Sequence, residues 1–164
     1  MAPELAIRLA TTDDMDEVMK LAVCASQENG FLDASAELLA REIWPALNLD
    51  HGLCPVIGPT GSNTIEGLAL LRTGHMWYSP TPILEERAVF IYPEFRSAKG
   101  GRARKLVEYS KHAADSLGMP LIMGILSSSR TAAKVGLYRR CFGEPAGAFF
   151  LYGASTLDEH SVTL

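Results

Sequence analysis

The stretch "LEERAVFIYPEFRSAKGGRARKLVEY", residues 84–109, decides the fold because it joins three kinds of local structure in direct succession. Its β-branched and aromatic first part predicts a strand over 83–93, closed by a proline. A turn with the glycine pair Gly100 and Gly101 follows. Apolar residues then recur every three or four positions from 101 to 117, which predicts an amphipathic helix.

Cations crowd this turn and the start of the helix. Within residues 95–105 there are five and no acid: Arg96, Lys99, Arg102, Arg104 and Lys105. A helix start exposes unpaired N–H groups and the positive pole of the helix dipole, which disfavours cations there by ~0.3–1 kcal/mol each. Glycines without a Cβ let the backbone approach a bound phosphate closely. We therefore expect an anion to bind at this turn.

Two common nucleotide-binding loops are excluded as the form of this anion site. The chain contains neither a G-x-x-x-x-G-K-[ST] loop nor a G-x-G-x-x-G pattern that opens a strand-helix-strand unit. The net charge of −4 and the isoelectric point near 5.5 also oppose broad binding to nucleic acid or to anionic membranes. The cations of the turn are therefore a local feature.

The rest of the chain predicts an alternation of strands and helices in one domain. Strands are expected at 5–9, 52–58, 65–74, 121–126 and 147–153, and helices from Thr12, from Ser35 to Pro45, and over 130–143. The order β-α-α-β-β-β-α-β-α-β indicates an α+β or mixed α/β sheet with crossovers. A length of 164 residues and 48% hydrophobic residues fit one globular domain with a real core.

Metal binding, disulfides and membrane insertion are not expected. The apolar runs are shorter than the ~20 residues of a membrane span, and the N-terminus lacks the pattern of a signal peptide. The three cysteines are far apart and the four histidines lack ligand spacing, so reduced thiols and no metal site are predicted. A cytoplasmic location follows as the expectation.

The stretch 84–118, followed by a short apolar strand and a helix with "GLYRRCFG", resembles the GCN5-related N-acetyltransferase (GNAT) superfamily. The order of elements matches as well, from about Ile7 to Tyr152. The resemblance implies a single domain over 1–153 with a C-terminal tail at 154–164. It also implies a central, mostly antiparallel, twisted sheet of six to seven strands, splayed between the fourth and fifth strands, with about four helices on its faces.

By resemblance, the basic turn binds the pyrophosphate of acetyl-CoA. The family has a Q/R-x-x-G-x-G/A turn, and the matching positions here are Arg96, Lys99 and Gly101, with Lys99 where the first glycine usually stands. The main chain of Val89 and Ile91 would hold the pantetheine arm. The implied acetyl-CoA residues are Val89, Phe90, Ile91, Arg96, Ser97, Lys99, Gly100, Gly101, Arg102 and Ala103, and no metal is implied.

Two residues are catalytic candidates. Tyr138 matches the tyrosine that in many members protonates the departing thiolate; its alternative role is packing between helix and sheet. Glu85 matches the place of a general base in some members and, by period two, shares a strand face with Ile91; its alternative role is that of a solvated acid. The same period places Glu86 on the opposite face.

The resemblance implies an N-acetyltransferase that moves an acetyl group from acetyl-CoA to a primary amine by direct attack in a ternary complex. The acceptor, a small molecule or a peptide, would enter over residues 26–35 and 72–80. A homodimer is one expected assembly, and neither nucleic acid nor membrane is an expected partner. The alternatives are a GNAT-like CoA sensor or protein-binding module without activity, which Lys99 favours, and a nucleic-acid binder, which the acidic isoelectric point opposes.

Overall fold

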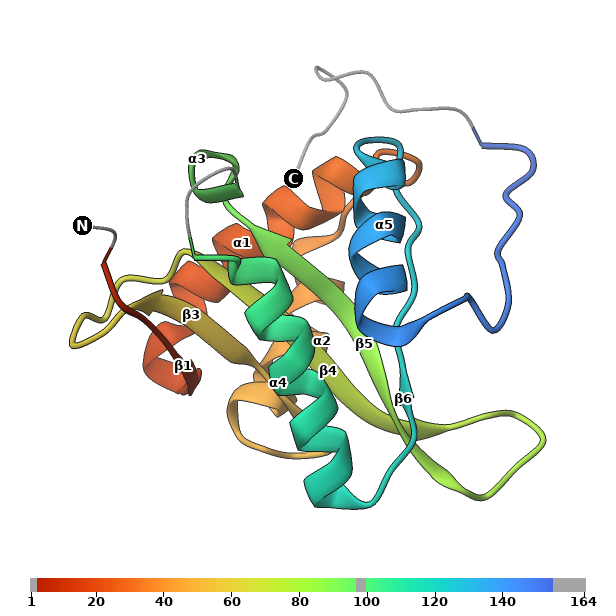
Figure 1. The fold of residues 1–164 in the computed structure, drawn as a ribbon, viewed down its shortest axis with the longest axis horizontal. Coiled ribbons are helices and arrows are strands. Elements are labelled where there is room, and N and C mark those ends of the chain that lie inside the picture. The colour runs from red at the N-terminus through yellow and green to blue at the C-terminus, as the bar shows by residue number, and fades with distance from the viewer. Residues whose placement is uncertain (1–2, 97–99, 155–164) are drawn as a thin grey trace.

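The structure is a computed structural model that describes residues 3–96 and 100–154, where six strands form one sheet (Figure 1). The strands are β1 (Leu5–Leu9), β2 (Gly52–Leu53), β3 (Pro55–Pro59), β4 (Gly67–His75), β5 (Pro82–Ile91) and β6 (Leu121–Ile122). Their order is β1-β3-β4-β5-β6, with β2 paired to β4. All pairs are antiparallel except β5 with β6. The predicted mixed α/β fold with a mostly antiparallel sheet is confirmed.

Helices cover both faces of this sheet. They are the 3₁₀ turn η1 (Thr12–Asp14), α1 (Met15–Asn29), α2 (Ala36–Leu47), α3 (Pro93–Arg96), α4 (Arg102–Leu117) and α5 (Thr131–Phe142). α1 and α2 lie behind the sheet in Figure 1, and α4 and α5 lie in front of it. None of the helices in 3–96 and 100–154 is long and apolar enough to cross a membrane.

Local sequence explains where the first helices begin and end. The carboxylate of Asp14 accepts a hydrogen bond from the backbone N–H of Thr11 at 2.8 Å and forms an ion pair with Arg8 at 2.7 Å. These two contacts hold the chain in place between β1 and α1. Ser35 caps α2 by accepting from the N–H of Leu38 at 3.3 Å. α1 ends at Gly30, which has the left-handed backbone that favours glycine at this position.

The core consists of two layers, one on each face of the sheet. One layer joins α1 and α2 to the sheet through Val18, Leu21, Ile43 and Leu68. The other joins α4 to the sheet, with Leu106 at its centre. Burial of such aliphatic side chains stabilises the fold by ~1.5–3 kcal/mol each, so both faces of the sheet are held by hydrophobic packing.

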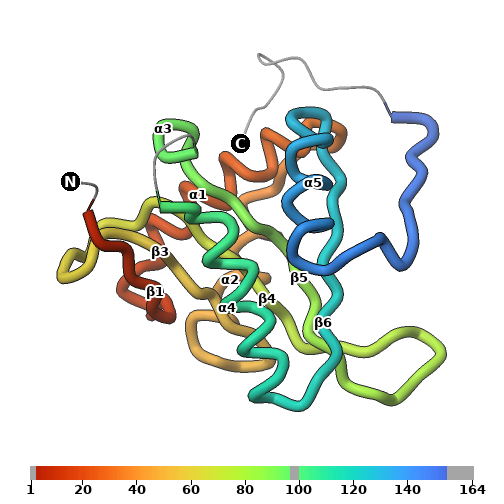
Figure 2. The backbone as a smooth tube through the Cα atoms, viewed as in Figure 1, coloured from red at the N-terminus to blue at the C-terminus, as the bar shows by residue number. Residues whose placement is uncertain are grey.

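The sheet opens between β5 and β6. These strands pair only at Leu84 with Leu121 and Glu85 with Ile122, and they then diverge, as the tube in Figure 2 shows. This is the splay expected between the fourth and fifth predicted strands. The predicted strand 121–126 is therefore too long, since it ends at Ile122. Because β5 turns away from β6, residues 123–126 have no neighbouring strand among the described residues with which to form backbone hydrogen bonds.

The strand expected at 147–153 is absent from the described residues. This segment swings away from the sheet beside α5 (Figure 2), and the side chains of Phe149, Phe150 and Tyr152 are 80%, 96% and 100% exposed. Apolar and aromatic residues give a segment strand propensity, but a strand also needs a partner edge. The ladder of β6 is two residues long and does not supply one.

Candidate active site

A cleft of about 660 Å³ lies where β5 and β6 diverge. Its walls are residues 86–91 of β5, the first turn of α4, residues 124–127 after β6, and one side of α5. The volume lies within the ~300–1,000 Å³ range of small-molecule sites. The cleft is thus built by the splay of the sheet, and α4 and α5 flank it.

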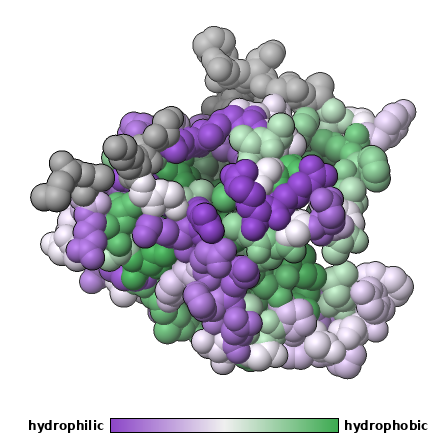
Figure 3. Space-filling model, viewed as in Figure 1, coloured by the Kyte–Doolittle hydropathy of each residue, from purple (hydrophilic) through white to green (hydrophobic). Residues whose placement is uncertain are grey.

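The N-terminus of α4 opens into this cleft without a cap from any described side chain. Gly101 is its N-cap residue, with φ of 58° and ψ of 46°, and the first turn contains no acid. A Cβ at Gly101 would meet none of the described atoms within 4 Å. Figure 3 shows hydrophilic side chains gathered where α4 and α5 face each other. The uncapped amides and the helix dipole make this end of α4 a place for an anion.

The side chain of Arg102 faces the core. Its guanidinium Nε lies 2.5 Å from Glu66 Oε2, and both side chains are almost fully buried. The guanidinium also lies over the ring of Phe95, 5.2 Å from its centroid. Arg102 therefore anchors the start of α4 to Glu66, and its side chain does not point into the cleft.

Loss of the Glu66 charge is expected to destabilise the protein. Glu66→Gln leaves the buried guanidinium of Arg102 without its anionic partner, which costs about 3 kcal/mol of unfolding free energy. Chemical denaturation measures the change. The control is Glu144→Gln, which removes one partner of the exposed pair with Arg139 and is expected to cost less than ~0.5 kcal/mol. Equal losses in the two variants would contradict the anchoring role.

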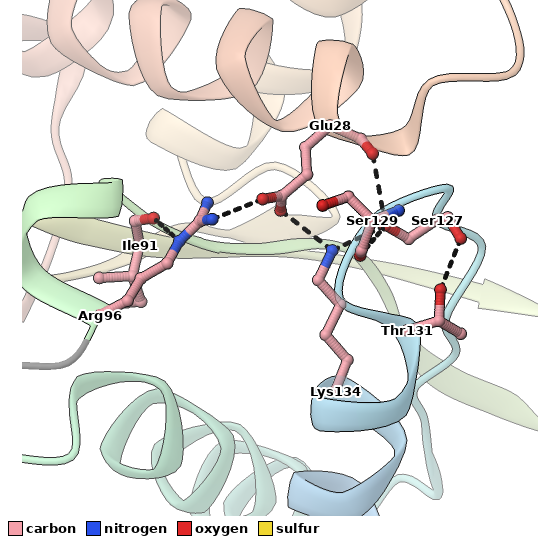
Figure 4. A network of polar contacts seen from close by, with 7 residues as sticks. All are labelled: Glu28, Ile91, Arg96, Ser127, Ser129, Thr131 and Lys134. Carbon is pink, nitrogen blue, oxygen red and sulfur yellow. Dashed lines mark hydrogen bonds and ion pairs between the residues drawn. The ribbon is translucent and has the colours of Figure 1, made fainter. Parts of the chain in front are cut away.

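Arg96 is also engaged with the protein itself. Its Nε donates to the carbonyl of Ile91 at 2.9 Å, and its Nη1 lies 2.6 Å from Glu28 Oε1. The other oxygen of Glu28 lies 3.0 Å from Lys134 Nζ, which also donates to Ser127 Oγ at 2.8 Å. Figure 4 shows Glu28 reaching from α1 between the two cations. This network ties α1, α3 and α5 together above the cleft.

Other cations remain available at the mouth of the cleft. Arg104 and Lys105 on the first turns of α4 are exposed, and Arg104 lines the cleft together with Arg130 and Arg140. Neither Arg130 nor Lys134 is predicted as a site residue, because they follow a loop whose course only the fold determines.

A β-bulge decides which acid of β5 faces the cleft. Leu70 pairs with Ala88 and Leu71 with Glu86, so Arg87 is an extra residue without a partner on β4. The bulge inverts the alternation of side chains: Leu84 and Val89 both pack on the α4 side, although their numbers differ in parity. Glu86 therefore shares the face of Val89. The prediction that period two places Glu85 on this face is wrong.

Glu86 and Tyr138 meet at the inner end of the cleft. The hydroxyl of Tyr138 donates to Glu86 Oε2 at 3.2 Å, and the N–H of Gly124 donates to the same oxygen at 3.0 Å. Burial raises the pKa of Glu86 to about 7, against the opposing effect of these hydrogen bonds. Burial, with the nearby Glu86, also raises the pKa of Tyr138 above its usual value. The pair thus combines an acid that titrates near neutral pH with a phenol that stays protonated.

The structure brings most of the predicted site residues together. The cleft is lined by Val89, Phe90, Ile91, Arg96, Gly101, Arg102, Ala103 and Tyr138. Gly100 lies at the turn but packs against β1, where a Cβ would come 2.5 Å from Leu5 Cδ1. Ser97 and Lys99 lie outside the described residues.

Besides Gly100, Glu85 is a described candidate that the structure places outside the cleft. It does not line the cleft; its carboxylate lies 3.8 Å from Arg87, which is in turn 3.3 Å from Glu42 of α2. Glu86 takes its position in the site, and the two-residue pattern of a regular strand could not have revealed this. The sequence shows two adjacent acids, but the bulge that selects between them is visible only in the pairing of β5 with β4.

Comparisons with known proteins agree with this geometry at the level of the fold. No family model matches the chain, and no curated protein matches its sequence. Among solved structures, the aminoglycoside N-acetyltransferase AAC(6')-Iy in complex with CoA is similar with a TM-score of 0.72 and 14% identity, over 93% of this chain and 96% of that chain. A GCN5-related N-acetyltransferase from Ralstonia eutropha JMP134 gives 0.66 and 15%, over 91% and 98%.

A third similar structure is an aminoglycoside acetyltransferase, meta-AAC0020, from an uncultured soil metagenomic sample in complex with sisomicin. Its TM-score is 0.61 and its identity 16%, over 94% of this chain and 97% of that chain. At these identities the likeness shows the fold, and the residues of the cleft must be weighed on their own chemistry.

Proposed function

We propose that this chain, which has the fold of the GCN5-related N-acetyltransferases, transfers an acetyl group from acetyl-CoA to a primary amine. One observation carries the proposal: the hydrogen-bonded pair of Glu86 and Tyr138 lies in the same cleft as the start of α4, which has a glycine N-cap and no acid in its first turn. The pair offers a proton acceptor and a proton donor, and the helix start offers a place for a polyanion.

The cleft suits acetyl-CoA as the acyl donor. The positive start of α4 and the exposed cations near it would hold the diphosphate, while the backbone of 86–91 lines the path from there to Glu86. Arg96 would not contact the diphosphate. Its side chain is bound to Glu28 and to the carbonyl of Ile91, so it would hold the end of β5 in position beside the donor.

Glu86 and Tyr138 would carry the protons of the reaction. An amine attacks a thioester only in its neutral form, so Glu86 accepts a proton from the incoming ammonium group directly or through water. As the new C–N bond forms and the C–S bond breaks, Tyr138 donates its proton to the leaving thiolate. Because its hydroxyl is hydrogen-bonded to Glu86, it can regain a proton from that carboxyl group.

Binding and transfer can be tested separately. CoA or acetyl-CoA at a hundred times Kd is expected to stabilise the protein by ~2.7 kcal/mol, a rise of several degrees in Tm. Release of CoA thiol with a panel of primary amines then measures transfer. Absence of a thermal shift with either compound would refute the proposal. A shift without transfer to any amine would support a CoA-binding module instead.

Tyr138→Phe tests the proton donor. We expect kcat to fall ~100-fold while the KM for acetyl-CoA stays within about twofold, because the phenyl ring retains its edge contact with Phe142. The control is Tyr109→Phe on α4, which lies outside the cleft lining. Thiol release at saturating substrates measures kcat. A Tyr138→Phe enzyme with unchanged kcat would show that the tyrosine only packs.

A further inference from the structure

A second hollow of about 290 Å³ adjoins the cleft on the side of α1 and α2. It lies between the end of α1, the loop 30–35 and the start of α2, and it shares Asn29 and Leu126 with the cleft as lining residues. A ligand seated there could therefore extend past Asn29 toward Glu86. The donor would occupy the α4 and α5 side of the splayed sheet, and this hollow lies on the other side.

The walls of the hollow are mainly apolar. Phe31, Leu32, Leu38, Leu39 and Leu126 line it. Three of these leucines are unusually exposed for their type: Leu32 at 66%, Leu38 at 58% and Leu126 at 45%. Exposed apolar side chains that gather around a concave surface are typical of a binding groove. The occupant therefore has an apolar body of small size.

The acids near this hollow are largely neutralised by the protein itself. Glu42 lies 2.8 Å from Arg72 and 3.3 Å from Arg87. Glu28, at the border of the cleft, is bound in the same way by Arg96 and Lys134. Arg87 is shared between Glu42 and Glu85, so that cluster is balanced. Glu28 is matched by two cations, so the border between the hollow and the cleft carries net positive charge there. A ligand with several ammonium groups would be repelled there.

Asp33 is the one acid of the hollow that no described residue pairs with. It is exposed on the loop between α1 and α2. A single exposed carboxylate can attract one ammonium group toward the hollow, but it cannot neutralise the charges of several ammonium groups on one ligand. The charge pattern therefore favours a ligand with one positive charge.

We propose that the acceptor is a small primary monoamine carried on an apolar body, an aromatic ring or a short alkyl chain, seated in this hollow. The inference rests on the proposed acetyl transfer and adds the substrate class. The apolar body packs against Leu38 and Leu126, and the amine reaches the cleft beside Asn29. Polycationic amines, such as the sisomicin in one of the similar solved structures, are excluded by the two cations that surround Glu28.

Three probe amines test this class: 2-phenylethylamine, ethylamine and sisomicin. We expect kcat/KM for 2-phenylethylamine to exceed that for ethylamine at least ~10-fold, since both carry one ammonium group and only the former has a ring to bury. Sisomicin is expected to be the poorest acceptor. Leu38→Ser should raise the KM for 2-phenylethylamine about tenfold and leave that for acetyl-CoA unchanged. Leu117→Ser, on an exposed leucine of α4 outside both hollows, is the matched control.

The outcomes separate the two proposals. A preference for sisomicin, or a preference for 2-phenylethylamine that survives Leu38→Ser, overturns the substrate class while acetyl transfer stands. If acetyl-CoA is neither bound nor consumed, the proposed function fails. Calorimetric titration of the native protein and of Leu38→Ser with 2-phenylethylamine then tests whether the hollow binds the amine, independently of acetyl transfer. About tenfold weaker binding in the variant supports the hollow as the amine site. Absence of binding to either protein overturns it.

Discussion

Gly101→Asp is expected to weaken CoA binding on the order of 100-fold while the protein stays folded. The carboxylate of an aspartate at this position competes with the diphosphate for the positive start of α4. It also places a negative charge beside that group. The left-handed backbone of Gly101 strains any side chain by on the order of 1 kcal/mol, and a Cβ there meets none of the described atoms within 4 Å. An uncharged side chain at the same position carries comparable strain, so a control variant separates strain from charge.

Gly101→Asn is the matched control for this experiment. Asparagine has the same shape and comparable backbone strain at this position, but it carries no charge. We expect CoA affinity in this variant to lie between those of the native protein and Gly101→Asp. Calorimetric titration with CoA measures all three, and thermal denaturation shows that each is folded. Full CoA affinity in Gly101→Asp would place the diphosphate elsewhere and remove the anion site from the start of α4.

Glu86→Gln is expected to lower kcat/KM by 10²–10³-fold, because it removes the proton acceptor of the cleft. In the native enzyme kcat/KM should rise with pH through about 7, the raised pKa of Glu86, and this limb should be lost in the variant. Glu85→Gln, one residue away on the opposite face, is the control and should retain activity within a few-fold. A loss in Glu85→Gln instead would contradict the placement of the bulge at Arg87.

The same substitution has a stability effect with a defined sign. The pKa of Glu86 is raised from 4.5 to about 7 in the folded protein, so its neutral form stabilises the native state fully below pH 4.5. That contribution is lost as the pH rises through 7. Glutamine stays neutral at every pH. As the pH rises from 4.5 to 8, the unfolding free energy of Glu86→Gln should therefore increase by up to about 3 kcal/mol relative to that of the native protein. Denaturation at the two pH values provides a readout that does not depend on activity.

Local sequence was enough to predict much of this protein. The strand predicted at 83–93 and the amphipathic helix after the glycine pair follow from residue types and spacing alone, and the structure has β5 and α4 there. β5 ends at Ile91, however, and the short helix α3 that follows it is not among the predicted elements. The absence of an acid in the first turn of α4 is itself a fact of the sequence. Such features depend on interactions between residues a few positions apart, which propensity and capping describe well.

The tertiary structure alone decided the contents of the cleft. The partners of Arg96 and Arg102 are Glu28 and Glu66, which lie far from them in the chain, so their pairing depends on how the elements pack. The bulge at Arg87 turns Glu86 rather than Glu85 to the cleft, because strand register is set by the neighbouring strand β4. The segment 147–153 has the composition of a strand but lacks a partner, since hydrogen bonds between strands come from another part of the chain.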